Sequence, residues 1–123
     1  MERIGLIDIK DHLVKNISHG DRKLLDLGVS LTIEPKILLL DEPTSGLSGK
    51  ERDNVVSLIM EDLCRTMKLV IVEHDMDVVF HISDQIMVLN RGTFLALGTP
   101  AEISNNAEVQ ESYLGGNLSN VRT

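Results

Sequence analysis

The chain has 123 residues, 42% apolar and 25% charged, which is enough for one small soluble domain with a core of its own. Its net charge of -7 argues against a nucleic-acid binder, which needs a basic surface, and two Phe and one Tyr are too few for a base-stacking platform. No apolar run approaches the roughly 18 to 20 residues that cross a bilayer, and charges interrupt the N-terminus where a signal peptide needs an apolar core, so we expect no membrane span.

The first third of the chain predicts short helical pieces, then a helix, then a strand. Residues 2–16 mix apolar and charged positions, which favours one or two short helical pieces. Ser18 is suited to cap a helix from about Gly20 to Ile33, and Pro35 closes that segment. Lys36–Asp41 is almost wholly apolar, as is typical of a strand covered on both faces in a parallel sheet.

The rest of the chain alternates helices and strands and ends in a hairpin. Apolar residues at helical spacing predict the next helix, and Asn90-Arg91-Gly92 is a turn signal between two strands. The predicted elements are helix Lys50–Met67, strand Leu69–Glu73, helix Asp75–His81, strands Ile86–Leu89 and Thr93–Leu97, a short helix opened by Thr99–Glu102, and helix Ala107–Leu114. This order predicts an α/β fold in which helices flank a parallel sheet with right-handed crossovers, followed by a C-terminal β-hairpin.

Acidic and histidine side chains follow two of the predicted strands. Asp41 and Glu42 come after the first strand, and His74 after the second. Ligands gather at the carboxyl ends of parallel strands, where one carboxylate could reach a Mg²⁺ shell, the other a water, and the histidine a phosphate. A polar strand end before a proline turn is the alternative, which the flanking ILLL and PTSGL disfavour.

A possible anion site lies at the start of the first long helix. Ser18 and Gly20, within the segment ISHGD, would leave free backbone N–H groups at the positive end of the helix dipole. Taken alone, a simple helix cap is the better explanation of this segment.

Together, these motifs resemble the C-terminal half of the ATP-binding cassette of ABC transporters, from about Asp8 to Gly115. ISHGD stands where the family has its signature motif, and ILLLDE matches Walker B with its catalytic glutamate. SGLS matches the D-loop, and VEHD carries the switch histidine. EHDMDVV, ISDQIMVLNRGTFLALGTPAEI and YLGG resemble the branch that energises uptake of branched-chain amino acids and urea. On this resemblance, residues 1–116 are the C-terminal half of a P-loop NTPase-like domain and 117–123 a flexible tail.

The resemblance implies ATP and Mg²⁺ as cofactors and a role for each motif. Asp41 would hold Mg²⁺ through water, Glu42 would act as general base, and His74 would contact the γ-phosphate. The D-loop residues would link the two sites of a head-to-tail dimer, and the signature residues would meet the ATP of the opposite subunit. The D-loop residues are Ser45, Gly46, Leu47 and Ser48, and the signature residues are Ser18, His19, Gly20 and Asp21.

Two signature residues depart from the family pattern, and the implied partners are proteins. His19 and Asp21 replace the usual glycine and glutamine, and the charge of Asp21 would compete with a phosphate. The partners would be a second ATP-binding subunit and transmembrane permease subunits, with no nucleic acid. The chain would be cytoplasmic, on the inner face of the cell membrane.

A complete cassette also needs the phosphate cradle G-x-x-x-x-G-K-[ST]. Gly49-Lys50 is the sole Gly-Lys pair, but Thr44 stands at the leading position and Glu51 follows the lysine, so this is not a cradle. We therefore expect a half-domain that binds Mg-ATP weakly alone and exposes apolar surface. Two functions stay open: an ATPase part active only with a P-loop-bearing region, or a non-catalytic interaction module for a complete cassette. The joint order of the motifs disfavours a generic α/β domain.

Overall fold

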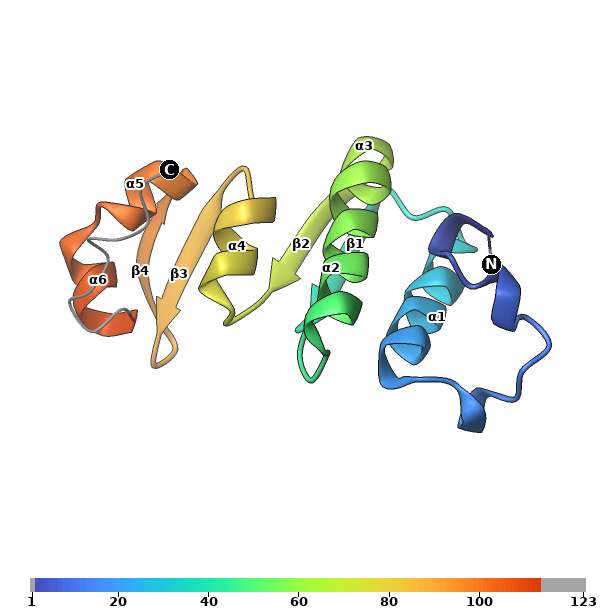
Figure 1. The fold of residues 1–123 in the computed structure, drawn as a ribbon. Coiled ribbons are helices and arrows are strands. Elements are labelled where there is room, and N and C mark those ends of the chain that lie inside the picture. Colours follow the sequence, from blue (N-terminus) through green and yellow to red (C-terminus); the bar gives the residue numbers. More distant parts are fainter. Residues whose placement is uncertain (1, 114–123) are drawn as a thin grey trace. The chain divides into compact units, whose positions relative to one another are not determined.

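The computed structural model describes residues 2–113, which divide into two compact units at Val78 and Val79 (Figure 1). Each unit has its own small sheet: a parallel pair in the first and an antiparallel hairpin in the second. The predicted α/β class with a C-terminal hairpin is confirmed. No helix among the described residues is long and apolar enough to cross a membrane.

The first unit begins with single helical turns and a capped helix. The turns η1 (Glu2–Ile4), η2 (Ile7–Ile9) and η3 (Val14–Asn16) confirm the short helical pieces predicted for this region. Helix α1 spans His19–Leu31, and the Ser18 side chain accepts a hydrogen bond from the N–H of Asp21, as expected of an N-cap. Its buried face carries Gly20, Leu24, Leu27 and Leu31.

Strands β1 (Ile37–Asp41) and β2 (Lys68–Val72) form the parallel pair, with Leu39 opposite Val70. Their burial alternates, so one face is half-buried and the other is open: Leu39 is 73% exposed and Val70 52%. The prediction of strands covered on both faces is therefore wrong for the described residues. The single crossover from β1 to β2 packs on one face, which leaves the other without a cover in this unit.

The crossover between these strands contains an irregular helix. Helix α2 (Gly49–Leu58) continues through a π-helical turn, η4 (Ile59–Leu63), into α3 (Cys64–Thr66). The region predicted as one helix is helical, but hydrophobic periodicity did not reveal the wide turn inside it. Ile59 and Leu63, both completely buried, belong to this turn and form the centre of the core here.

The second unit is a hairpin covered by two short helices. Helix α4 (Met76–Ile82) leads into β3 (Ile86–Asn90), which pairs with β4 (Thr93–Gly98) around a turn in which Arg91 and Gly92 both have positive φ. Positive φ at both central residues is the mark of a type I′ turn. Helices α5 (Pro100–Ser104) and α6 (Ala107–Tyr113) follow the hairpin. The core of this unit is Ile86, Val88, Ala96, Ile103 and Val109.

A few predicted features lie outside the described residues. The predicted last helix ends at Leu114, but the structure describes residues only up to Tyr113. Leu114 and the predicted polar tail at 117–123 therefore lie outside the described residues.

Candidate functional site

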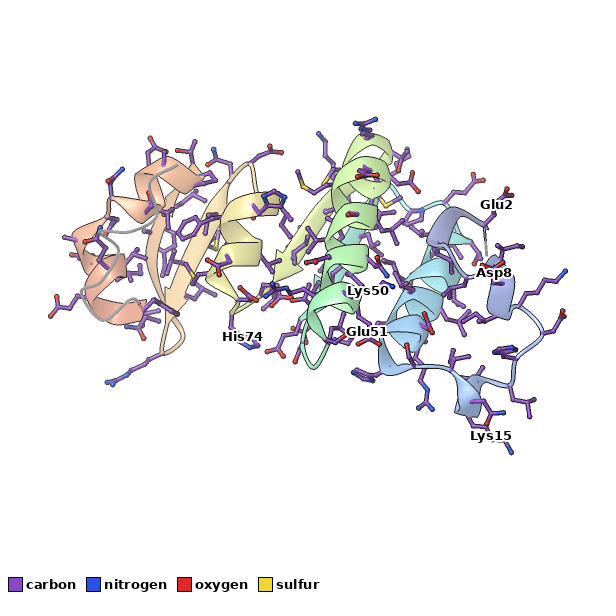
Figure 2. The ribbon with its side chains drawn as sticks, in the orientation of Figure 1. Glu2, Asp8, Lys15, Lys50, Glu51 and His74 are labelled. Carbon is purple, nitrogen blue, oxygen red and sulfur yellow. The ribbon has the colours of Figure 1, made fainter. Side chains whose placement is uncertain are left out.

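The carboxyl ends of β1 and β2 bring Glu42 and His74 together. The Nδ1 atom of His74 lies 3.4 Å from Oε1 of Glu42, and both side chains are open to solvent. Figure 2 labels His74. Asp41 is the last residue of β1, and its carboxylate is also exposed. The expectation that these residues meet at one edge of a parallel sheet agrees with the geometry of Glu42 and His74. An exposed carboxylate beside an imidazole can accept a proton from a water.

The backbone of Glu42 is unusual and firmly held. Its φ of 45° places it in the left-handed region, which few non-glycine residues adopt. Its N–H donates to the Val72 carbonyl at 2.8 Å, and its carbonyl accepts a hydrogen bond of 2.8 Å from Nζ of Lys23 on α1. These bonds hold the strand end in a conformation that turns the chain sharply after Asp41.

Glu73 braces the same edge, a role that the sequence did not reveal although it places this carboxylate at the strand end. Oε1 of Glu73 accepts hydrogen bonds from the N–H of Thr44, at 2.9 Å, and from the Thr44 hydroxyl. Thr44 is a buried polar residue that follows Glu42 and Pro43, while Glu73 directly precedes His74. This pair therefore ties the loop that carries the expected base to the segment that carries the histidine. The only sequence signal was a hydroxyl residue after the Glu-Pro step.

The start of α1 does not offer free N–H groups at the positions expected. The Gly20 N–H donates to Oε1 of Glu51 at 3.1 Å, and the Asp21 N–H donates to Oγ of Ser18 at 3.0 Å. The free donors considered for this helix start are therefore absent at these two groups, and the alternative, a simple helix cap, is confirmed. The first N–H groups of a helix lack a partner within the helix and commonly donate to side chains, and here the side chains of Ser18 and Glu51 are the acceptors.

The carboxylate of Glu51 is the most heavily hydrogen-bonded acidic group near this site. Its Oε2 accepts from the Ser48 hydroxyl at 2.7 Å and from the Ser48 N–H at 3.0 Å, which completes a capping box at the start of α2. The pKa of Glu51 is lowered to about 2 by hydrogen bonding, first from the hydroxyl and N–H of Ser48 and then from the Ser18 hydroxyl and the Gly20 N–H. Sequence reasoning considered Glu51 only for a phosphate cradle and missed this role.

The two segments expected to form the signature motif and the D-loop lie side by side. A Cβ built on Gly46 would be 3.5 Å from Nε2 of His19, so the imidazole ring covers the turn at Gly46. Gly46 itself has a φ of +72°, which an L side chain rarely adopts. Residues 18–21 and 45–48 thus meet through His19 and Gly46 as well as through Glu51.

The donor set at the strand end suits Mg²⁺ bound mainly through water. Asp41 offers one exposed carboxylate, and no cluster of three acidic, histidine or cysteine ligands exists among residues 2–113. Mg²⁺ typically takes one or two carboxylates and completes its shell with waters and substrate phosphates, so Asp41 fits an ion that arrives with a nucleotide.

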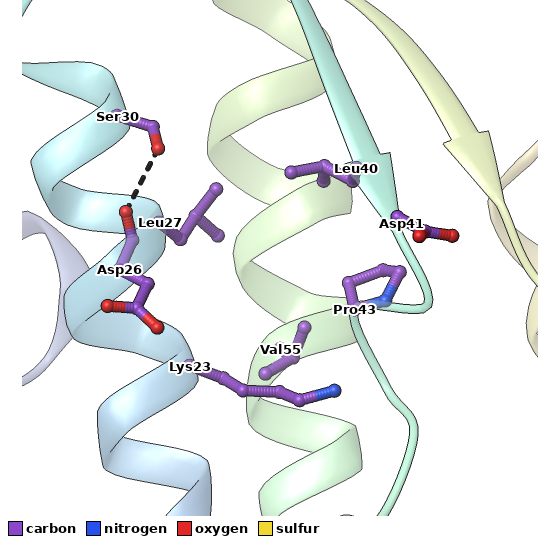
Figure 3. Close-up of a pocket in the computed structure, with 8 residues that line it drawn as sticks. All are labelled: Lys23, Asp26, Leu27, Ser30, Leu40, Asp41, Pro43 and Val55. Atoms are coloured by element: carbon purple, nitrogen blue, oxygen red, sulfur yellow. Dashed lines mark hydrogen bonds between the residues drawn. The ribbon is translucent and has the colours of Figure 1, made fainter.

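A pocket of about 250 Å³ lies between α1, α2 and the end of β1 (Figure 3). Four apolar residues form much of its wall, and Ser30 donates a hydrogen bond to the carbonyl of Asp26 at its rim. It is smaller than the roughly 300 to 1,000 Å³ typical of ligand pockets, so we do not assign it to a nucleotide. Its lining residues are Lys23, Asp26, Leu27, Ser30, Leu40, Asp41, Pro43 and Val55.

Two family models match the chain. The model described as ABC transporter matches residues 1–45, and the model described as branched-chain amino acid ATP-binding cassette transporter matches residues 95–118. The first match includes the end of β1, and the second begins in β4, so both parts of the chain match models of the same class of protein.

Curated relatives are similar along nearly the whole chain. The high-affinity branched-chain amino acid transport ATP-binding protein LivG of Salmonella typhimurium is 42% identical over 116 residues, which is 94% of this chain and 46% of that protein. LivG of Escherichia coli K12 is 41% identical over the same shares, and BraF of Pseudomonas aeruginosa is 35% identical. The chain therefore spans about half the length of the curated relatives that it matches.

Solved structures agree with this relationship. The ADP conformation of MJ1267, an ATP-binding cassette of an ABC transporter, is 25% identical with a TM-score of 0.81, and the match covers 93% of this chain and 46% of that one. The structure of cbiO1 from Clostridium perfringens, described as part of the ABC transporter complex cbiONQ, is 30% identical with a TM-score of 0.77, covering 95% and 47%. The fold is thus that of half of such a cassette.

Proposed function

Because the chain belongs to the ATP-binding cassette family of ABC transporters and spans about half of a cassette, we propose that it supplies the water-activating half of a transport ATPase. The observation that carries this proposal is the meeting of Glu42 and His74, 3.4 Å apart, at the strand end beside Asp41. The chain hydrolyses ATP only when joined to a region that bears a phosphate cradle.

Each residue at the strand end has a task in this reaction. Asp41 would hold the water shell of Mg²⁺, which when bound would neutralise charge on the phosphates. Glu42 orients the attacking water and takes its proton at a carboxylate oxygen. His74 donates to the γ-phosphate while its position is fixed by Glu42 and by the segment that Glu73 braces.

The surface formed by residues 18–21 and 45–48 serves a second nucleotide-binding subunit. In a head-to-tail dimer, the signature residues meet the ATP that the opposite subunit holds, and the D-loop residues connect the two sites. Their side-by-side placement, with His19 against Gly46, supports a single docking surface.

We further propose that the complete assembly takes up amino acids, and that branched-chain amino acids are its preferred substrates. The support is the name of the LivG and BraF relatives and the family match at residues 95–118. In that assembly the chain binds transmembrane permease subunits on the inner face of the cell membrane.

The test joins the chain to the phosphate-cradling half of a related cassette, either fused or co-expressed, and measures ATP hydrolysis. We expect turnover that neither part shows alone, and a loss of about 10²- to 10⁴-fold in kcat for Glu42→Gln with ATP binding retained. Glu34→Gln is the matched control, since Glu34 also has a left-handed backbone (φ 49°) but lies outside the site. Full ATP turnover by the Glu42→Gln variant would show that Glu42 is not the general base.

An interaction module is the second candidate, and the open face of β1 and β2 favours it. Leu39 and Val70 are more than half exposed there, which is a surface suited to another protein. Titrating the chain into a complete cassette and measuring its ATPase rate separates the two functions. An unchanged rate at saturation rules out the module.

A further inference from the structure

Two capping boxes among the described residues share the same pair of hydrogen bonds to their glutamate. In the first, Glu51 accepts from the N–H and hydroxyl of Ser48, and in the second Glu102 accepts from the N–H and hydroxyl of Thr99. Both lower the pKa of the glutamate because the carboxylate accepts hydrogen bonds. The second box thus shows what a glutamate at this position does when it only caps its own helix.

Glu51 does more than cap its own helix. Its second oxygen, Oε1, accepts the N–H of Gly20 at 3.1 Å, a group 31 residues earlier in the chain. The carboxylate therefore sits at the N-termini of α1 and α2 at once. Both helix dipoles favour a negative charge there, in addition to the hydrogen bonds.

Gly20 is the residue that permits this approach. A Cβ built on Gly20 would lie 2.7 Å from both Cγ and Oε1 of Glu51, closer than side-chain contacts allow. Because these atoms belong to a flexible side chain, a methyl group at position 20 would displace the carboxylate from the helix start. The close packing of Gly20 thus has a cause inside the chain, independent of any nucleotide.

We propose that Glu51 is a positioning residue that locks the signature segment, residues 18–21, to the D-loop segment, residues 45–48. When Glu51 bonds to both Gly20 and Ser48, the two segments that would meet the opposite subunit move together. Lys23, which bonds the Glu42 carbonyl, and His19, which covers Gly46, hold the same side of α1 to the same loop. The consequence for ATP hydrolysis rests on the proposed function, whereas the lock itself is a property of the chain.

The test compares Glu51→Gln with Glu102→Gln by amide hydrogen exchange in the 123-residue chain. We expect the Glu51 variant to exchange faster by about fivefold or more at His19, Gly20 and Asp21, which are far from the substitution in sequence. Glutamine has one acceptor oxygen in place of two, so it cannot accept from Ser48 and Gly20 as the carboxylate does, and the loss of one hydrogen bond corresponds to about this factor. Glu102→Gln should leave these amides unchanged, because its carboxylate bonds only to Thr99. Unaltered exchange at residues 19–21 in Glu51→Gln overturns the lock, whether or not the chain supports ATP hydrolysis.

A second measurement uses the cassette restored with its cradle-bearing half. Glu51→Gln should lower kcat by about fivefold while the KM for ATP stays constant, because the locked surface acts after ATP is bound. A merely structural loss would appear equally in Glu102→Gln, and equal kcat losses in the two variants would overturn the positioning role. A restored wild type without any turnover refutes the proposed function instead, and the exchange result then decides the lock alone.

The Gly20→Ala variant tests the same contact from the other side. Its methyl group should displace the Glu51 carboxylate, so combining Gly20→Ala with Glu51→Gln should accelerate exchange no more than the stronger single change. Fully additive effects would show that the two residues act independently and would contradict the lock.

Discussion

At the residue scale, Glu42 shows that the site holds its expected base under backbone strain. A left-handed conformation costs a non-glycine residue about 1–2 kcal/mol, and Glu42 adopts it with a φ of 45°. The surrounding bonds offset this cost: Val72 and Lys23 bind its peptide groups, and Glu73 binds Thr44 two residues later. A strained residue at a strand end needs such support, which makes the brace testable.

Thr44→Val should weaken the brace without changing the size of the side chain. The substitution removes the hydroxyl donor to Glu73 from a buried position, so we expect the free energy of unfolding to fall by about 1–2 kcal/mol, measured by urea denaturation. Thr32→Val is the control, since the exposed Thr32 bonds only the carbonyl of Val29 in its own turn. If both variants lose the same free energy of unfolding, the bond between Thr44 and Glu73 does not stabilise the fold more than an ordinary surface hydrogen bond does.

Glu51 gives the chain a predictable response to acid. Its pKa is about 2 in the folded chain and 4.5 without the hydrogen bonds, so the folded state binds fewer protons in between. The stabilisation is complete above pH 4.5 and is lost as the pH falls towards 2. Urea denaturation at stepped pH should show this decline, and Glu51→Gln should make it shallower. A variant with the same pH dependence as the wild type would contradict the assigned hydrogen bonds.

Sequence reasoning found the residues that sit at strand ends and missed those that join distant segments. Asp41, Glu42 and His74 were accessible because an apolar run predicts where a strand ends and which edge its last residues share. The bonds of Glu51 to Gly20 and of Glu73 to Thr44 span 31 and 29 residues. No local pattern encodes such a contact, since it depends on how two helices and two strands pack.

At the element scale, the hairpin turn carries a residue that its geometry does not favour. Arg91 has a φ of 49° and precedes Gly92 at 77°, the pattern of a type I′ turn, in which asparagine is preferred at the first central position. Arg91→Asn should therefore stabilise the second unit by up to about 1 kcal/mol, detected by thermal denaturation. Arg91→Ala removes the same charge without the tolerance for positive φ and should give no gain. Loss of stability in Arg91→Asn would refute the turn assignment.

The elements also show where periodicity stops being informative. Every predicted strand and helix of the described residues is present, with ends shifted by one to a few residues, as for β2, which begins at Lys68 instead of Leu69. The π-helical turn at Ile59–Leu63 was not foreseen, because apolar residues at helical spacing do not distinguish an α-helical from a π-helical turn.

At the scale of the whole molecule, the open face of the parallel pair exposes apolar side chains that a folded domain usually buries. Ile37, Leu39, Val70 and Val72 present apolar side chains to solvent on one face. Burying one such side chain is worth about 1.5–3 kcal/mol, so a partner that covers several of them gains substantially. The expected exposure of apolar surface is thus found on the face of this sheet opposite the crossover helix, and also on the hairpin of the second unit, at Met87, Leu89, Phe94 and Leu97.

This face should make the isolated chain self-associate, and Leu39 is the residue through which to show it. Leu39→Thr places a β-branched residue, which suits a strand, in position 39 and removes the apolar side chain that is 73% exposed, so sedimentation should show a shift towards monomer with little loss of folding stability. Leu63→Ala is the contrast: Leu63 is completely buried, and its truncation should cost about 2–5 kcal/mol while leaving the open face intact. If the wild-type chain is monomeric at high concentration, or if Leu39→Thr associates as strongly as the wild type, the open face is not the surface through which copies meet. In the restored cassette, Leu39→Thr should weaken assembly with the cradle-bearing half in proportion to the apolar area that this half covers.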